Sequence, residues 1–170
     1  RRVTREPGQA ARGAPPARPA PGYLVRPVSS ANGVAYAHRE RNLADFKLTP
    51  LLPRKHSQDG PGIAVGDVDG NGLDDVFVGA DRGQARTLFL QRAPGTFAPR
   101  PLAGDSLRDD MGALFFDADG DGDQDLYLAS GGSYPAADSS LYRHTLYVND
   151  GRGGLGPGGA ALPGVHTSGP

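Results

Sequence analysis

The sequence predicts an all-β fold: part of a β-propeller, with about two four-stranded blades preceded by a disordered leader. Three observations predict it. The 170 residues include 26 glycines and 16 prolines, which are unfavourable inside helices. A unit of about 50 residues is repeated, a period typical of a propeller blade. Short apolar runs alternate with turn-rich loops, as in sheets that are buried on both faces.

The composition of residues 1–22 predicts a disordered leader. Proline and glycine recur too often there for helix or sheet, and large apolar residues are almost absent. Residues 1–60 carry 11 Lys/Arg and 4 Asp/Glu, whereas residues 61–150 carry 6 and 15. A basic arm before an acidic body can bind nucleic acid, with a steep dependence on salt. These arginines are scattered among Ala, Pro and Gly, so we interpret the leader as solvated and expect no nucleic-acid partner.

Residues 23–58 form a lead-in segment in which apolar side chains return. Apolar runs at 23–25, 34–36 and 43–46 are interrupted by Pro27, Pro50 and Pro53. We therefore expect short strands and loops there.

The body of the chain repeats itself. Residues 62–80 align without a gap on 112–130, at an offset of 50 residues, and residues 87–97 match 145–155 at an offset of 58. The eight additional residues fall within 131–144, which is rich in Ser, Gly and Ala. The repetition predicts two copies of one supersecondary unit.

The repeat also sets the expected boundaries. We expect blade 1 at residues 59–104 and blade 2 at residues 105–166. Residues 167–170 resemble the segment just before the first unit, so we interpret them as the start of a truncated third blade.

Each unit reads as β structure. Short apolar runs precede and follow a loop, and a third run lies further on. The expected strands are 63–65, 76–78 and 87–91 in the first unit and 113–116, 126–128 and 145–149 in the second. Residues 149–151 contain the Asp-Gly signal of a tight hairpin.

The loop in each unit carries oxygen side chains at positions 1, 3, 5 and 9. So many carboxylates repel one another unless a cation lies among them, and a hard divalent cation, most simply Ca²⁺, prefers such ligands. Position 7 can offer its backbone carbonyl, and glycine at positions 4 and 6 permits the curl. The expected ligands of two calcium sites are Asp67, Asp69, Asn71, Leu73 and Asp75, and Asp117, Asp119, Asp121, Asp123 and Asp125.

Two alternatives compete with the calcium site. A solvated acidic turn is one, but two loops in register between apolar runs argue against it. The EF-hand is the other, and it needs a bidentate Glu at position 12 and flanking helices. Position 12 is Val78 in the first loop and Leu128 in the second, so the EF-hand is rejected. Asp74, at position 8, is expected to face solvent.

The sequence contains few residues or motifs that are typical of an enzyme active site. The chain has no cysteine, and its four histidines show no zinc-site spacing. No nucleophile elbow, phosphate-binding loop or dinucleotide fingerprint occurs, and we interpret the glycine-rich residues 151–159 as hairpin and linker. No apolar run is long enough for a transmembrane segment, and no signal peptide is visible. We expect no enzymatic activity in this chain.

The two repeats closely resemble the FG-GAP/VCBS repeats of integrin-α-like β-propellers, in which this acidic loop binds calcium. Residues 45–47, 51–57 and 60–67 also look like bacterial secreted VCBS-repeat proteins, which often carry an ASPIC/UnbV domain and are similar to cartilage acidic protein. Asn71 departs from the commonest loop, which has Asp there, and lowers the charge of the first site.

This resemblance implies a calcium-binding propeller fragment of a secreted or cell-surface protein. It would act as a scaffold for adhesion or ligand binding in an extracellular, cell-surface or periplasmic location. Its partners would be an extracellular macromolecule or glycan and the remaining blades of a parent propeller. The alternative is a non-catalytic part of a propeller enzyme that acts on polysaccharide. A convergent cluster of His, Tyr and acid in one pocket would favour that alternative.

Overall fold

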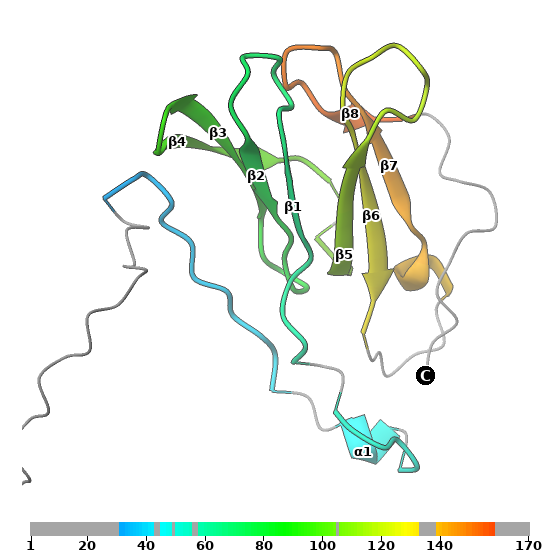
Figure 1. Cartoon of the computed structure of the whole chain (residues 1–170). Coiled ribbons are helices and arrows are strands. Elements are labelled where there is room, and N and C mark those ends of the chain that lie inside the picture. Colours follow the sequence, from blue (N-terminus) through cyan, green and yellow to red (C-terminus); the bar gives the residue numbers. More distant parts are fainter. Residues whose placement is uncertain are drawn as a thin grey trace, which may run out of the picture.

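Two four-stranded antiparallel sheets lie side by side in the computed structural model (Figure 1). It describes residues 31–42, 45–48, 50–55, 58–104, 106–132 and 139–158. The expected leader at residues 1–22 and the expected start of a third blade at 167–170 lie outside the described residues.

Both sheets are simple meanders, because each strand pairs with the next one along the chain. The first sheet contains β1 (Ile63–Gly66), β2 (Asp75–Val78), β3 (Arg86–Ala93) and β4 (Thr96–Leu102). The second contains β5 (Asp109–Phe116), β6 (Asp125–Gly131), β7 (Thr145–Val148) and β8 (Gly156–Pro157). Four-stranded meanders that stack face to face are the blades of a propeller, so the predicted all-β, partial-propeller fold is confirmed.

Two local expectations differ from the structure. Four-stranded blades are expected, but only three strands are located in each unit, and the fourth strand of the first sheet is β4. It contains Pro99 and Pro101 and lies at the edge of its sheet, where residues without an N–H donor are tolerated. The tight hairpin expected at residues 149–151 is wrong. The connection from β7 to β8 runs over residues 149–155, and Asp150 accepts hydrogen bonds from the backbone N–H groups of Arg152 and Gly154 inside it.

The core lies between the sheets and draws on both. Ala64 of β1 and Phe115 of β5 point into it, so their neighbours along each strand point the other way. Apolar runs of this kind are typical of strands buried on both faces between stacked blades, and a blade without a neighbour is expected to leave one face bare. The outer faces of β1 and β5 have no covering sheet among the described residues, and they are bare in this way. The core residues are Ala64, Val68, Phe77, Leu88, Leu90, Phe115, Leu126, Leu128 and Tyr147. The outward-pointing residues Ile63, Val65, Leu114 and Phe116 are 58%, 59%, 57% and 40% exposed.

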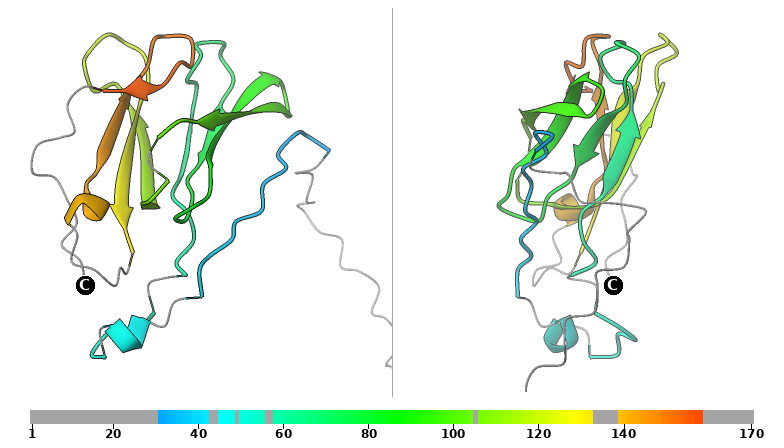
Figure 2. Two further views of the ribbon diagram at one scale, coloured as in Figure 1. Left: turned by 180° about the vertical axis from the view of Figure 1, so that it is seen from behind. Right: turned by 60° about the vertical axis from the view of Figure 1, so that its left-hand side comes forward.

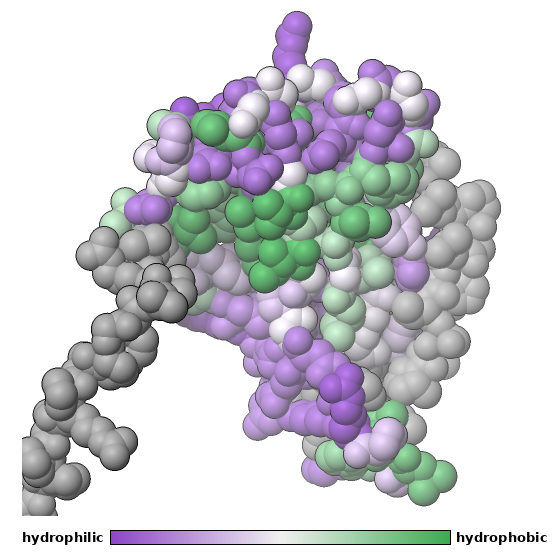
Figure 3. Space-filling model, viewed as in Figure 1, coloured by the Kyte–Doolittle hydropathy of each residue, from purple (hydrophilic) through white to green (hydrophobic). Residues whose placement is uncertain are grey.

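Figure 3 shows the consequence at the surface. An apolar patch lies in the middle of the face that carries β1 and β5, below a hydrophilic band at the loop end of the sheets. A patch of this kind usually marks an association surface.

The described lead-in residues contain no strand. Residues 31–42 run along the outer side of the first sheet, and α1 (Asp45–Leu48) is a single helical turn (Figures 1 and 2). Short strands were expected here, but the contacts are made through side chains and isolated backbone groups. The ring of Tyr36 packs edge-on against Phe89 at 6.4 Å, and its hydroxyl donates to the carbonyl of Gly79 at 2.7 Å.

The two sheets are in close backbone contact at Gly62. Its N–H donates to the carbonyl of Asp110 at 2.7 Å, and its carbonyl accepts from Gly79 at 2.8 Å. A Cβ at this position would lie 2.6 Å from the carbonyl carbon of Gly112, so only glycine permits this approach. Within the described residues, no helix is long and apolar enough to cross a membrane.

Candidate metal centres

The loops that join β1 to β2 and β5 to β6 lie at the same end of the molecule (Figure 1). In each loop, three carboxylates offer oxygen atoms that all lie within 4.8 Å of one another. The clusters are Asp67, Asp69 and Asp75 in the first loop and Asp117, Asp119 and Asp125 in the second. The structure therefore brings together the residues at positions 1, 3 and 9 of both predicted sites.

The first carboxylate of each loop shapes the curl. Asp67 accepts hydrogen bonds from the backbone N–H groups of Asn71 at 3.1 Å and Gly72 at 2.8 Å. Asp117 accepts from Gly120 at 2.6 Å and Gly122 at 3.1 Å. Gly72 and Gly122 have φ angles of 83° and 95°, which side chains strongly disfavour. Glycine at these positions is thus required for the shape, as the spacing predicts.

The last carboxylate closes each loop from inside the protein. Asp75 is fully buried and accepts from the N–H groups of Val68 at 2.9 Å and Gln91 at 2.7 Å. Asp125 does the same in the second repeat, with the N–H groups of Ala118 at 2.9 Å and Asn149 at 2.8 Å.

The pKa of Asp75 reflects this position. Burial raises its pKa above the ordinary value, and the charges of Asp69 and Asp67 act in the same direction, although the two backbone donors oppose them. A cation between the carboxylates would relieve this cost of ionisation.

The residues at positions 5 and 7 are placed differently. Asn71 accepts from the N–H of Leu73 at 2.8 Å and donates its amide to the carbonyl of Gln91 at 3.0 Å. Asp121 accepts from the N–H of Asp123 at 3.1 Å and lies outside the three-carboxylate cluster. Ligation by Asn71 and Asp121, and by the carbonyls of Leu73 and Asp123, stays a prediction. Asp74 is exposed, as expected.

The donor chemistry of both loops fits a hard divalent cation. Every side chain in the clusters is a carboxylate, and calcium takes oxygen ligands. The Asp69 side chain is only 8% exposed, yet its Oδ1 has no hydrogen-bond partner among the described residues. In the second loop, Oδ1 of Asp123 is buried and has no hydrogen-bond partner in the part of the chain that the structure describes. Desolvation, and then the charges of Asp121 and Asp125, raise the pKa of Asp123.

One buried side chain, which the sequence analysis missed, links the two loops. Asn149, 5% exposed, donates its amide to the carbonyl of Val68 in the first loop at 2.8 Å and to that of Gln124 in the second at 2.9 Å. The only sequence signal is that Asn149 aligns with Gln91 of the first repeat, whose N–H bonds the corresponding carboxylate. The second sheet is therefore tied to both loops.

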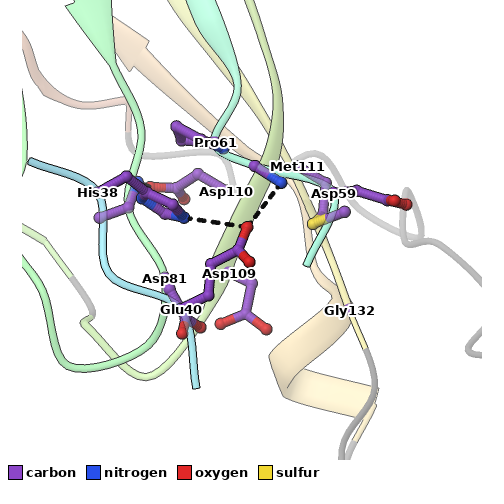
Figure 4. Close-up of a pocket in the computed structure, with 11 residues that line it drawn as sticks. His38, Glu40, Asp59, Pro61, Asp81, Asp109, Asp110, Met111 and Gly132 are labelled. Atoms are coloured by element: carbon purple, nitrogen blue, oxygen red, sulfur yellow. Dashed lines mark hydrogen bonds and ion pairs between the residues drawn. The ribbon is translucent and has the colours of Figure 1, made fainter. Parts of the chain in front are cut away.

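A second polar site lies near the junction of the lead-in segment and the two sheets (Figure 4). Its cavity has a volume of about 20 Å³, room for about one water molecule. The Nε2 atom of His38 lies 3.5 Å from Oε1 of Glu40, which also accepts from the N–H of Gly60 at 2.9 Å. The titratable residues that line the cavity are His38, Glu40, Asp59, Asp81, Asp109 and Asp110.

Arg41 holds a pair of carboxyl groups beside this cavity. Its Nε lies 3.2 Å from Asp81 and its Nη2 lies 3.0 Å from Asp109. Burial and the hydrogen bond with Asp81 raise the pKa of Asp109 to about 7. Burial opposes ionisation of Asp81 as well, but hydrogen bonds from Asp109 and from the N–H groups of Arg41 and Arg82 lower its pKa overall. The pair thus shares one proton near neutral pH.

The four histidines do not converge among the described residues. His38 lines the cavity and is contacted by the Tyr36 hydroxyl at 3.2 Å, whereas His144 hydrogen-bonds to Tyr127 in the second sheet. His56 and His166 lie outside the described residues. His38 and the acids share one cavity, and Tyr36, which does not line it, contacts His38; a convergent cluster of these residue types was expected to favour the enzyme alternative. These residues lie up to 70 or so positions apart in sequence, which hid them from motif analysis.

Comparison with known protein families gives one match, which covers part of the chain. Residues 67–128 match the family model of the FG-GAP-like repeat, a span that begins at the first acidic loop and ends in β6. Searches of the curated proteins and of the solved structures found no match.

Proposed function

We propose that this chain is a calcium-binding module of a β-propeller in a secreted or cell-surface protein, and that it serves as a scaffold for binding an extracellular macromolecule or glycan. One observation carries the proposal: the same three-carboxylate cluster occurs twice, at equivalent positions of two repeats. The match to the FG-GAP-like repeat over residues 67–128 supports it, because such repeats commonly bind calcium.

Calcium would supply positive charge that holds each acidic loop in its curl. Asp67, Asp69 and Asp75 would bind it in the first loop and Asp117, Asp119 and Asp125 in the second, as their convergence suggests. The backbone hydrogen bonds to the first and last carboxylates already orient oxygen atoms toward one another. The protein therefore pays little conformational entropy on binding.

The scaffold role rests on the outer faces of the sheets. Leu114 of β5 and Ile63 of β1 are 57% and 58% exposed on strands that a neighbouring blade would cover in a larger propeller. Remaining blades of a parent protein are the partners that fit this geometry. Membership of the bacterial secreted type with an ASPIC/UnbV domain, and a role in adhesion, belong to the same proposal.

A second candidate function is favoured by one observation. The cavity beside His38 and Glu40 combines an imidazole with a carboxyl pair, Asp81 and Asp109, whose pKa values diverge, and acid–base catalysis on polysaccharide uses groups of this kind. The phenol of Tyr36 does not line the cavity but contacts His38. Arg41 already neutralises the carboxyl pair, and the cavity of about 20 Å³ does not admit a sugar. We therefore propose a structural role for this cluster and no enzymatic activity.

Calcium titration by calorimetry tests the proposed function. The native chain is expected to release or absorb heat with saturation at two ions. Replacing one central carboxylate in each loop, in the double variant Asp69→Ala and Asp119→Ala, is expected to abolish that heat. Calcium heat that is unchanged in the double variant would overturn the proposal. Asp74→Ala, which removes an exposed carboxylate from the same loop, is the matched control and should leave the titration as it is.

A further inference from the structure

The first loop contacts a basic side chain, whereas no basic side chain among the described residues forms an ion pair with the second loop. Arg92, near the end of β3, places its Nη1 at 2.8 Å from Oδ2 of Asp69. When the two repeats are aligned, Asp150 stands where Arg92 stands in the first repeat. Equivalent positions beside the two acidic loops therefore carry opposite charges.

Asp69 is the residue on which this difference acts. Its side chain is 8% exposed, one oxygen is paired with Arg92, and the other has no hydrogen-bond partner in the described part of the chain. Asp69 also belongs to the carboxylate cluster with Asp67 and Asp75. A cation that enters this cluster must share Asp69 with the guanidinium or displace it.

The acidic residues within the loops also make the first loop less negative than the second. Residues 67–75 contain four carboxylates and residues 117–125 contain five, because Asn71 and Leu73 stand where the second loop has Asp121 and Asp123, whereas Asp74 stands where it has Gln124. The positive charge of Arg92 neutralises one of the four carboxylates of the first loop, namely Asp69. The Arg92 side chain is 56% exposed, so it can move into solvent without breaking a packed core.

We propose that Arg92 acts as an internal counter-ion that competes with calcium for Asp69. The first loop then binds calcium more weakly than the second, and the two sites fill in order rather than together. This inference rests on the proposed function, because it takes both loops to be calcium sites.

Two glycines report separately on the two sites. The N–H of Gly72 donates to Asp67 at 2.8 Å, and the N–H of Gly122 donates to Asp117 at 3.1 Å. In a calcium titration of the 170-residue chain followed by NMR, the amide signal of Gly122 is expected to saturate at a lower calcium concentration than that of Gly72. In Arg92→Gln, the concentration that half-saturates Gly72 is expected to fall about fivefold, and that of Gly122 to stay within about twofold.

Two further variants serve as controls. Arg143→Gln makes the same charge change at an exposed residue just before β7, at the end of the second sheet that lies away from the acidic loops. It is expected to leave Gly72 within about twofold of native, since exposed charges at a distance are screened by salt. Arg92→Lys keeps the positive charge, so the calcium concentration that half-saturates Gly72 is expected to stay close to that of the native chain. If Arg92→Gln does not fold, a Gly72 response in Arg92→Lys that differs from native by more than about twofold would overturn the inference.

The outcomes separate the two proposals. If neither glycine responds to calcium, the proposed function fails, and this inference fails with it. If both respond but Gly72 saturates first, or if Arg92→Gln leaves Gly72 unchanged, only the inference is overturned. An equal shift in Arg92→Gln and Arg143→Gln would attribute the effect to net charge and would also overturn it.

Discussion

Replacing Asp125 should destabilise the protein even when no calcium is present. This carboxylate is fully buried and accepts hydrogen bonds from the N–H groups of Ala118 at 2.9 Å and Asn149 at 2.8 Å. Asp125→Ala leaves the buried N–H of Asn149 without a partner, which costs about 1–3 kcal/mol, whereas the N–H of the exposed Ala118 can turn to water instead. We expect a loss of about 1–3 kcal/mol, against a total stability of about 5–15 kcal/mol for an ordinary domain.

The assay is urea unfolding followed by circular dichroism in the presence of a chelator, since the chain has no tryptophan to serve as a fluorescent probe. Asp121→Ala is the matched control in the same loop, because Asp121 is exposed and accepts one backbone hydrogen bond, from Asp123. Its expected loss is below about 1 kcal/mol. Equal losses in the two variants would refute the argument that the last carboxylate of each loop is a structural anchor as well as a ligand.

Three further outcomes are expected. Because the native pKa of Asp109 is raised to about 7, the folded protein retains a proton that the unfolded chain loses above about pH 4, so the free energy of unfolding should fall as pH rises from about 4 to 7. Asp109→Asn should flatten that slope in thermal unfolding; an unchanged slope would assign it to other groups. Gly62→Ala should cost about 1–3 kcal/mol, because its Cβ would meet the backbone of the other sheet, whereas Gly156→Ala, with open space around it, should be nearly neutral in the same unfolding assay. The chain should self-associate through its exposed apolar faces, and Ile63→Lys with Leu114→Lys should shift its sedimentation toward the monomer; sedimentation that is the same for both proteins would contradict this.

The repeated, local features of the protein could be predicted from the sequence. The apolar runs at Val76-Phe77-Val78 and Leu126-Tyr127-Leu128 lie in β2 and β6, and the acidic loops precede them as expected. The convergence of Asp67, Asp69 and Asp75 could also be predicted, because these residues lie within nine positions of one another and glycines fix the curl. Local sequence encodes such features directly.

Features that depend on contacts between distant segments could not be predicted. Arg41 meets Asp109 across 68 positions, and Asn149 meets Val68 across 81. No sequence spacing identifies either pair, because the residues come together only when the two sheets stack. Strand β4 was hidden for another reason: Pro99 and Pro101 oppose a strand on propensity, and only its edge position makes them acceptable. The exposure of Leu114 follows from which faces have a neighbouring sheet, which one repeat alone does not specify.

The most direct test of the central claim, that each acidic loop holds one calcium ion, is to count the ions by native mass spectrometry of the chain and its single variants. Two bound ions are expected for the native chain, one for Asp69→Ala, one for Asp119→Ala, and none when both are changed. A native chain without bound calcium, or single variants that still hold two ions, would contradict it.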